Sequence, residues 1–208
     1  MEQAQSLLLN ELAFVRCPDP QKNIFIYEWL KYLDRILTLT KKSDLKNSQQ
    51  KLVEQLNARI VPNGCSHPTR LLLGRCIAKL FSVADASHLF ETINLCNDAT
   101  ALSVLGEMFE YLGRMVGRSY EETFQSLAKW LKSAESNARI EILQTLAKML
   151  HGLGSGTFPI FKDIYKCLAK ALFDRVMAVR VAAANVNIFF FFFEFFFDLG
   201  PVFWVTKT

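Results

Sequence analysis

The three histidines and five cysteines of this chain are the residues most able to bind a metal ion. Cys65 and His67 lie two positions apart, but no second close pair follows them. Because a zinc site needs about four converging ligands, we expect Cys65 in a loop and His67 at a helix start. His88 stands beside apolar residues, and His151 lies near an expected helix end, where a cation suits the helix dipole. The sequence therefore predicts no metal site and no cofactor.

The segment GLGSG at 152–156 has the glycine content of a phosphate-binding loop. Such a loop follows a strand and continues into Gly-Lys-Ser or Gly-Lys-Thr, whereas this segment follows a helical pattern and lacks that continuation. We interpret it as the end of one helix and a turn before the next. Glu121, Glu122 and Glu141 fall on polar helix faces, and no Ser-His-Asp arrangement with a supporting motif is present. We predict no catalytic residue and expect a protein that is not an enzyme.

Two arginines, Arg139 and Arg180, occupy similar places, since each follows a short polar turn into a helical pattern. They could bind an anion, but we favour a structural role between neighbouring repeats, with Asp174 and Glu135 as candidate acceptors. The interval between them fits a period of about 40 residues with two helices per unit, which is typical of HEAT or armadillo arrays. Arg70 could mark an earlier copy, yet the interval from Arg70 to Arg139 is not twice the interval from Arg139 to Arg180, which breaks the regularity.

The elements that would position these residues are helices. Before residue 185, apolar residues recur at helical spacing, and no convincing alternating strand pattern is present. The clearest stripes are Ile26, Leu30, Leu33 and Leu37; Tyr120, Phe124, Leu127 and Leu131; Ile142, Leu146, Met149, Leu150 and Leu153; and Phe161, Ile164, Tyr165, Leu168 and Leu172. We expect helices near 3–15, 22–40, 44–61, 68–83, 85–95, 98–116, 119–134, 137–152, 159–173 and from about 176.

Two local signals support these helix starts. Pro68 suits the first turn of a helix, and Ser119 with Glu122 has the spacing of a capping box. The predicted fold class is all-α, and the predicted architecture is an α-solenoid of HEAT/armadillo-type helical hairpins. A hairpin cannot bury its apolar face alone, so stacking would complete the core. A non-repeating helical bundle is the alternative.

The end of the chain differs from what precedes it, because eight phenylalanines fall within the short segment 189–197. We therefore expect a helical repeat domain over 1–185 and a separate Phe-rich tail over 186–208. The apolar run is too short for a membrane span of about 20 residues, and Glu194 interrupts it. Phenylalanine codons form a pyrimidine tract, and Val186-Asn187 can be encoded by a splice-donor-like sequence, so we interpret the tail as translated intron.

Composition narrows the function classes. The formal charge of +4 is spread along the sequence without a basic run, so nucleic-acid binding by a helical-repeat protein is the alternative function rather than the leading one. Five widely spaced cysteines do not form a disulfide framework, which favours a reducing compartment. The N-terminus has no basic leader, so no signal peptide is expected.

Several blocks occur in one order along the chain: SLLLNE (6–11), IFIYEWLKYLDRIL (24–37), QKLVEQL (50–56), HPTRLLLGRCIAKLFS (67–82), LGRMVGRSYEET (112–123), LKSAES (131–136) and KDIYKCLAKALFDRVMAVRVAAA (162–184). Together they resemble the N-terminal region of the HEAT repeat-containing protein 5 family. Members of that family are around ten times longer, so this chain would be a fragment or a truncated product. The stretch at 95–112 is shorter than the family's equivalent.

The resemblance implies a non-enzymatic scaffold in vesicle-mediated membrane traffic, including endocytosis, endosome-to-Golgi retrograde transport and protein localisation. It implies protein partners, namely clathrin-adaptor accessory proteins, and no small-molecule substrate. It also implies a cytoplasmic protein that is peripheral at the trans-Golgi network and endosomes, held there through partners rather than by a transmembrane span. No partner-binding residue is carried over, because no family motif defines one.

Overall fold

The computed structural model describes residues 7–60 and 65–196, and the side chains of its last helix as far as Asn187. This described part is all-helical and contains no strand, as predicted. Its elements are α2 (Glu11–Arg16), α3 (Asp19–Leu37), α4 (Lys42–Leu45), α5 (Gln49–Asn57), α6 (His67–Val83), α7 (Leu89–Cys96), α8 (Leu102–Leu112), η1 (Gly113–Val116), α9 (Ser119–Ser133), α10 (Ser136–Leu153), η2 (Gly154–Ile160), α11 (Phe161–Ala171) and α12 (Met177–Phe196).

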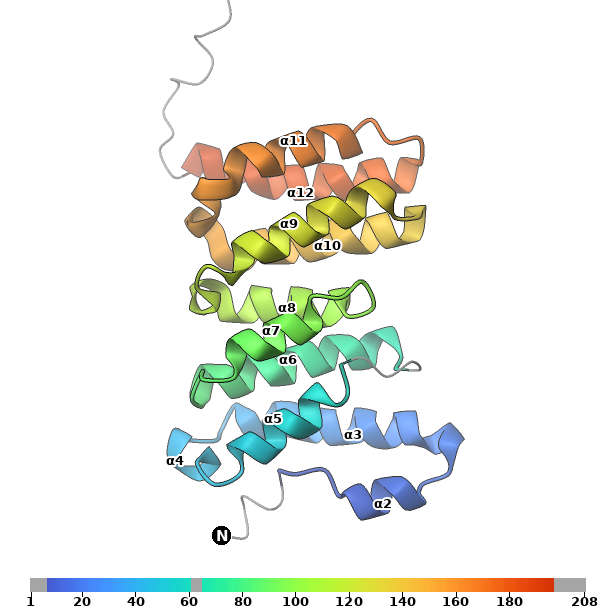
Figure 1. Cartoon of the computed structure of the whole chain (residues 1–208), viewed down its shortest axis with the longest axis vertical. Coiled ribbons are helices and arrows are strands. Elements are labelled where there is room, and N and C mark those ends of the chain that lie inside the picture. Colours follow the sequence, from blue (N-terminus) through green and yellow to red (C-terminus); the bar gives the residue numbers. More distant parts are fainter. Residues whose placement is uncertain (1–6, 61–64, 197–208) are drawn as a thin grey trace, which may run out of the picture.

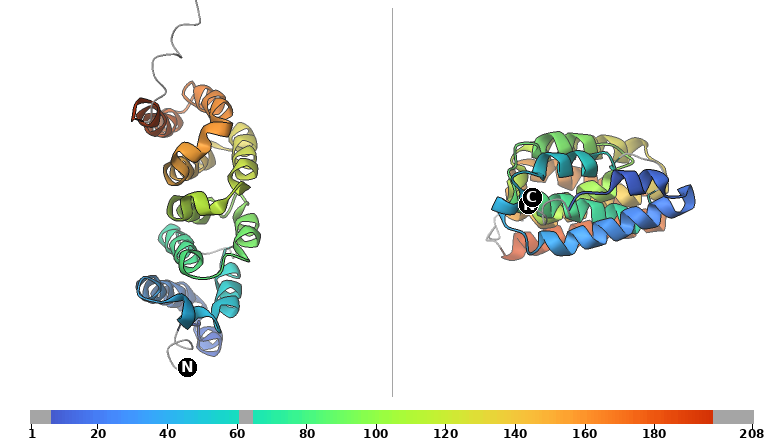
Figure 2. Two further views of the ribbon diagram at one scale, coloured as in Figure 1. Left: turned by 90° about the vertical axis from the view of Figure 1, so that its left-hand side faces the viewer. Right: turned by 90° about the horizontal axis from the view of Figure 1, so that it is seen from below.

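The longer helices lie in two rows (Figures 1 and 2). The row that we call the back row contains α3, α6, α8, α10 and α12, and its members pack on one another in that order. The front row contains α5, α7, α9 and α11. Here α9 packs on α10 and α11 packs on α12, so each of these front-row helices rests on the helix that follows it in the chain. The chain thus alternates between the rows as it runs from one end of the molecule to the other.

Glycines set the closest approaches within the back row. A Cβ added to Gly74 of α6 would lie 2.5 Å from the carbonyl oxygen of Val104 in α8. A Cβ added to Gly152 of α10 would lie 2.1 Å from the carbonyl oxygen of Phe109, also in α8. Atoms cannot approach so closely, so both contacts require glycine. The sequence interpretation of Gly152 as part of a helix end is therefore incomplete: the helix ends at Leu153, and Gly154 follows with a positive φ of 53°.

The spacing of the back-row helices explains the irregular arginine period. The helices α6, α8, α10 and α12 begin at His67, Leu102, Ser136 and Met177, so the first two steps between starts are shorter than the third. The interval from Arg70 to Arg139 thus spans two short steps, whereas the interval from Arg139 to Arg180 spans one long step. Arg70 does take a position like that of Arg139, since its guanidinium donates to the carbonyl oxygen of Thr100, just before α8.

Several expected boundaries differ from the structure. The helix expected at 44–61 is divided into α4 and α5, and the helix expected at 98–116 ends at Leu112 because Gly113 has a φ of 52°. Of the helix expected at 3–15, residues 3–6 lie outside the described residues, and α2 begins only at Glu11. Pro68 lies in the first turn of α6, as predicted.

The expected capping box at Ser119 is not formed. The N-cap of α9 is Arg118, and the hydroxyl of Ser119 donates instead to the carbonyl oxygen of Val116 at 2.6 Å. Ser119 is therefore the first residue of the helix, one position too late to cap it, although the helix does begin where we predicted.

The predicted apolar stripes form the core, with one clear exception. All stripe residues of α3, α9 and α10 are buried and belong to one continuous cluster. In α11, Ile164 and Leu168 are buried, but Tyr165 is 54% exposed. The buried face of α11 is therefore narrower than the sequence stripe suggested.

The last helix crosses the boundary that we expected at residues 185 and 186. The backbone of α12 continues to Phe196, and Val179, Ala183 and Val186 are buried against the core. Residues 197–208 lie outside the described residues. None of the helices in the described part is long and apolar enough to cross a membrane. The interpretation of the tail as translated intron stays a prediction.

Candidate functional site

Three of the four predicted inter-repeat residues meet at the turn between α11 and α12. The guanidinium of Arg139, near the start of α10, forms an ion pair with the carboxylate of Asp174. The other carboxylate oxygen of Asp174 accepts from the backbone N–H of Val176 at 2.9 Å. Arg180 donates to the backbone carbonyl oxygen of Asp174 at 2.9 Å. Asp174 therefore links α10 to the turn, and the stabilising role of the three residues stays a prediction.

Glu135, the fourth residue of that set, takes a different position. It is the N-cap residue of α10, and its backbone carbonyl accepts the N–H of Arg139 at 2.9 Å. Its side chain is exposed, and no hydrogen bond or ion pair joins its carboxylate to either arginine in the described part.

The residues weighed for metal binding lie apart. His67 begins α6, His88 contacts the carboxylate of Glu91 at 3.0 Å, and His151 lies 3.3 Å from a carboxylate oxygen of Glu110. Across residues 7–60 and 65–196, no group of three or more His, Cys, Asp or Glu side chains could hold a metal ion. The glycine-rich segment at 152–156 ends α10 and begins the 3-10 helix η2, as expected for a turn.

A ladder of ion pairs, which the sequence analysis did not predict, joins the back-row helices. Asp34 of α3 pairs with Lys79 of α6 at 2.7 Å. Glu107 of α8, only 4% exposed, pairs with Arg75 of α6 at 3.5 Å and with Lys148 of α10. We call these five residues the back-row ladder. A buried carboxylate needs such partners, because an unpaired charge in the core is strongly destabilising.

A groove lies between the front-row helices α9 and α11, with a volume of about 470 Å³. Its lining residues are Phe124, Ala128, Leu131 and Lys132 of α9; Arg139 of α10; Asp163, Lys166, Cys167, Lys170 and Ala171 of α11; and Asp174. We call it the α9–α11 groove. It exists because α9 and α11 share no extensive contact with each other and pack instead on α10 and α12.

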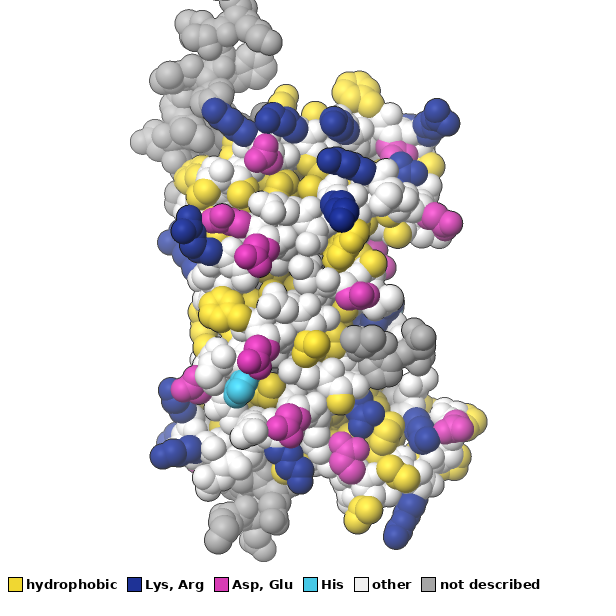
Figure 3. Space-filling model, in the orientation of Figure 1, with side chains coloured by type: hydrophobic (Ala, Val, Ile, Leu, Met, Phe, Trp, Pro, Cys, Tyr) yellow, Lys and Arg dark blue, Asp and Glu magenta, His cyan; other side chains and the backbone are white. Residues whose placement is uncertain are grey.

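Basic side chains surround this groove, although the sequence analysis described the charge as spread along the chain. Exposed lysines of α9 and α11 gather on one face, and Figure 3 shows Lys and Arg side chains concentrated over these two helices. Three of these lysines, Lys132, Lys166 and Lys170, line the groove, and Arg139 of α10 joins them. The elements α9 and α11 are separated by a whole back-row helix in sequence, so no basic run appears until the chain is folded.

The two lysines at one end of the groove lack ionic partners. Lys166 pairs with Asp163 at 3.4 Å, and Arg139 pairs with Asp174. Within the described residues, neither Lys132 nor Lys170 forms an ion pair. Each lies in the last turn of its helix, where a cation is favoured by the helix dipole.

The pKa of the Cys167 thiol reflects the environment inside the groove. Burial raises its pKa above the ordinary value, and the positive charges of Lys132 and Lys170 oppose that rise. Both lysines therefore lie close enough to the groove interior for their positive charge to affect the Cys167 thiol. Cys76 and Cys96 are fully buried in the core, and burial also raises their pKa values.

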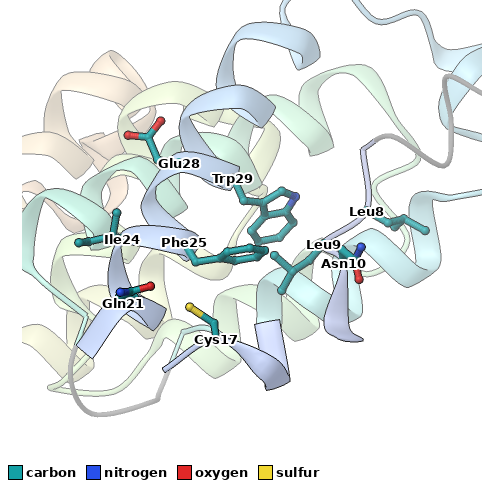
Figure 4. A pocket seen from close by; sticks show the side chains of 9 residues that line it. All are labelled: Leu8, Leu9, Asn10, Cys17, Gln21, Ile24, Phe25, Glu28 and Trp29. Atoms are coloured by element: carbon teal, nitrogen blue, oxygen red, sulfur yellow. The ribbon is translucent and has the colours of Figure 1, made fainter. Parts of the chain in front are cut away.

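A second hollow of about 630 Å³ lies at the opposite end of the molecule (Figure 4). It is lined by Leu8, Leu9, Asn10, Cys17, Gln21, Ile24, Phe25, Glu28 and Trp29. The adjoining chain is held by the side-chain amide of Gln55, which accepts from the N–H of Leu9 at 2.9 Å and donates to its carbonyl oxygen at 3.1 Å. The hollow is largely apolar and has no unpaired cation among its lining residues.

Comparison with known proteins gives a weak similarity. The chain is similar to Protein SWEETIE of Arabidopsis thaliana, with 24% identity over 183 residues, covering 81% of this chain and 8% of that protein. The chain therefore spans only a small part of the length of this relative. No protein-family model matches the chain, and no solved structure matches it. The expected membership of the HEAT repeat-containing protein 5 family is wrong, because the similarity found is to a protein outside that family.

Proposed function

We propose that this chain is a non-enzymatic α-solenoid of HEAT/armadillo type whose surface binds other proteins. One observation carries this proposal. The back-row helices pack on one another in chain order, and front-row helices rest on their successors, which supports an extended pile of helices over a closed bundle. Such piles present long surfaces suited to protein partners.

Other features of the described residues favour binding over catalysis. The two hollows described above are lined mainly by apolar and charged side chains, and neither joins a nucleophile to a base. The titratable groups with raised pKa values are Tyr120 and four cysteines, each shifted chiefly by burial. A role in vesicle traffic rested on the family resemblance alone, so the proposal does not include it, nor a place at the Golgi or endosomes.

The test is direct binding by the purified full chain. Proteins captured on the immobilised chain are identified and then purified, and their binding to the chain is measured in solution by calorimetry. We expect at least one saturable complex with a protein. Saturable binding to oligonucleotides, steeply weakened by salt, without any direct protein complex would overturn the proposal in favour of a nucleic-acid-binding repeat protein.

A further inference from the structure

We infer that the α9–α11 groove binds an acidic amphipathic helix of a partner protein. This inference rests on the proposed protein-binding function and adds the site and the chemistry of the partner. The groove supplies two kinds of contact that such a helix requires: an apolar floor and a cationic end.

The floor of the groove is apolar and recessed. Phe124 is 4% exposed and Leu131 is 9% exposed, so their side chains form the base rather than project outward. Ala128 and Ala171 also line the groove, and their small side chains leave depth between α9 and α11. A helix lying in a groove buries side chains at positions i, i+3 and i+4, which matches a hollow bounded by two helices.

The charges of the groove select an acidic partner. Asp163 and Asp174 are already paired with Lys166 and Arg139. Lys132 and Lys170 remain without carboxylate partners among the described residues and lie at the same end of the groove. Glutamates beside the apolar stripe of a partner helix would pair with them. Charge complementarity of this kind raises the association rate and excludes basic partners.

The same observations argue against the other anionic partners. Nucleic acid would need exposed aromatic side chains for stacking, and the aromatic ring of the groove, Phe124, is buried in its floor. A membrane surface would need apolar side chains that project beyond the lysines, because interfacial helices insert their apolar face into the lipid. Among the residues that line the groove, Phe124 and Leu131 are buried, whereas Lys132 and Lys170 are exposed.

The probe is a synthetic peptide of about 15 residues, long enough for a marginally stable helix. Leucines occupy one helical face, and glutamates flank them. A scrambled peptide of the same composition, which has no apolar face, is the control. Binding of each fluorescent peptide to the full chain is measured by anisotropy, beside anionic phospholipid vesicles and a single-stranded oligonucleotide.

The variant Lys132→Glu/Lys170→Glu reverses both unpaired charges. Its matched control is Lys46→Glu/Lys51→Glu, which changes the net charge equally at two exposed lysines in the α4–α5 region. We expect the first variant to bind the amphipathic peptide about tenfold more weakly or worse, because two attractions become repulsions. We expect the control variant to bind as the unaltered chain does.

Cysteine labelling locates the bound peptide without any mutation. Cys167 lines the α9–α11 groove and Cys17 lines the hollow at the other end, and both are half-buried. The rate at which iodoacetamide labels each thiol is followed by mass spectrometry. We expect the amphipathic peptide to slow labelling of Cys167 and to leave Cys17 unchanged.

Three outcomes would overturn the inference: equal peptide binding by both double variants, protection of Cys17 rather than Cys167, or lysine-dependent binding of the vesicles or the oligonucleotide without binding of the peptide. Failure here is separable from failure of the proposed function. If proteins that bind the unaltered chain directly also bind Lys132→Glu/Lys170→Glu equally well, the scaffold proposal stands and only the groove is wrong.

Discussion

The back-row ladder and the α9–α11 groove contain the same residue types in opposite situations. In the ladder, Glu107 is buried and meets cations from both neighbouring helices. In the groove, Lys132 and Lys170 are exposed and meet no carboxylate in the described part of the chain. The difference separates paired charge, which joins successive helices, from unpaired charge, which we propose is available to a partner.

The largest effect should come from the packing that brings the ladder residues together. In Gly152→Ala, the new Cβ would meet the backbone of Phe109, so α8 and α10 must separate. We expect a loss of about 3 kcal/mol in unfolding free energy, as for overpacked cores. Gly106→Ala is the control, since its Cβ would lie 3.1 Å from the flexible Lys148 side chain. Equal denaturant midpoints for the two variants would show that the close approach does not matter.

The ladder itself is tested by Glu107→Gln, which keeps the shape of the side chain and removes its charge. Because Lys148 and Arg75 are only partly buried, they can turn to water, so we expect a loss of about 2 kcal/mol rather than more. Chemical unfolding measures it. Glu91→Gln, at an exposed carboxylate, is the control. If Glu107→Gln is as stable as this control, the back-row ladder does not contribute to stability.

The inter-repeat arginines should have a smaller effect. Arg180→Ala removes hydrogen bonds to the carbonyl oxygens of Asp174 and Arg175, and we expect a loss of about 1 kcal/mol. For a chain of this size that lowers Tm by roughly 2–4 °C. Calorimetry checks the value. An unchanged melting temperature together with weakened partner binding would instead make Arg180 a binding residue.

The smallest effect on stability is expected for Lys132→Glu/Lys170→Glu, within about 0.5 kcal/mol of the unaltered chain. Neither lysine forms an ion pair within the described residues, so the remaining cost is the unfavourable placement of an anion at each helix C-terminus, which salt screens at exposed positions. Thermal melting at two salt concentrations checks this expectation. A large, salt-dependent loss would mean that these lysines stabilise the helix ends and are not reserved for binding.

Sequence periodicity was sufficient for the helices but not for their spacing. The stripes of α3, α9 and α10 predicted both helix and core, because each of these helices buries a broad face. The arginine spacing did not give a regular period, because the last step between back-row helices is longer than the two before it. In addition, α8 contains no arginine that would mark the step between α6 and α10. Tyr165 was placed in the core because a stripe gives no sign of how wide a face its neighbours cover.

The two charged regions were missed for different reasons. Glu107 left a signal, since a single carboxylate among the small and apolar residues of LSVLGEMF can be buried only with a cation beside it. The α9–α11 groove left no such signal in the sequence. Lys132 and Lys170 lie far apart in the sequence, and only the fold places them at one end of a hollow. Surfaces built from alternate helices of a pile cannot be recognised from a linear charge pattern.

The comparison between the two regions is tested most directly by one crossed measurement. Unfolding free energy and affinity for the acidic amphipathic peptide are determined on the same preparations of Glu107→Gln and Lys132→Glu/Lys170→Glu. We predict that Glu107→Gln lowers the unfolding free energy but that its folded form binds the peptide with unchanged affinity. We predict that Lys132→Glu/Lys170→Glu has a nearly unchanged unfolding free energy but binds the peptide much more weakly. If both variants lose the two properties together, or neither loses either, the division between structural and binding charge is contradicted.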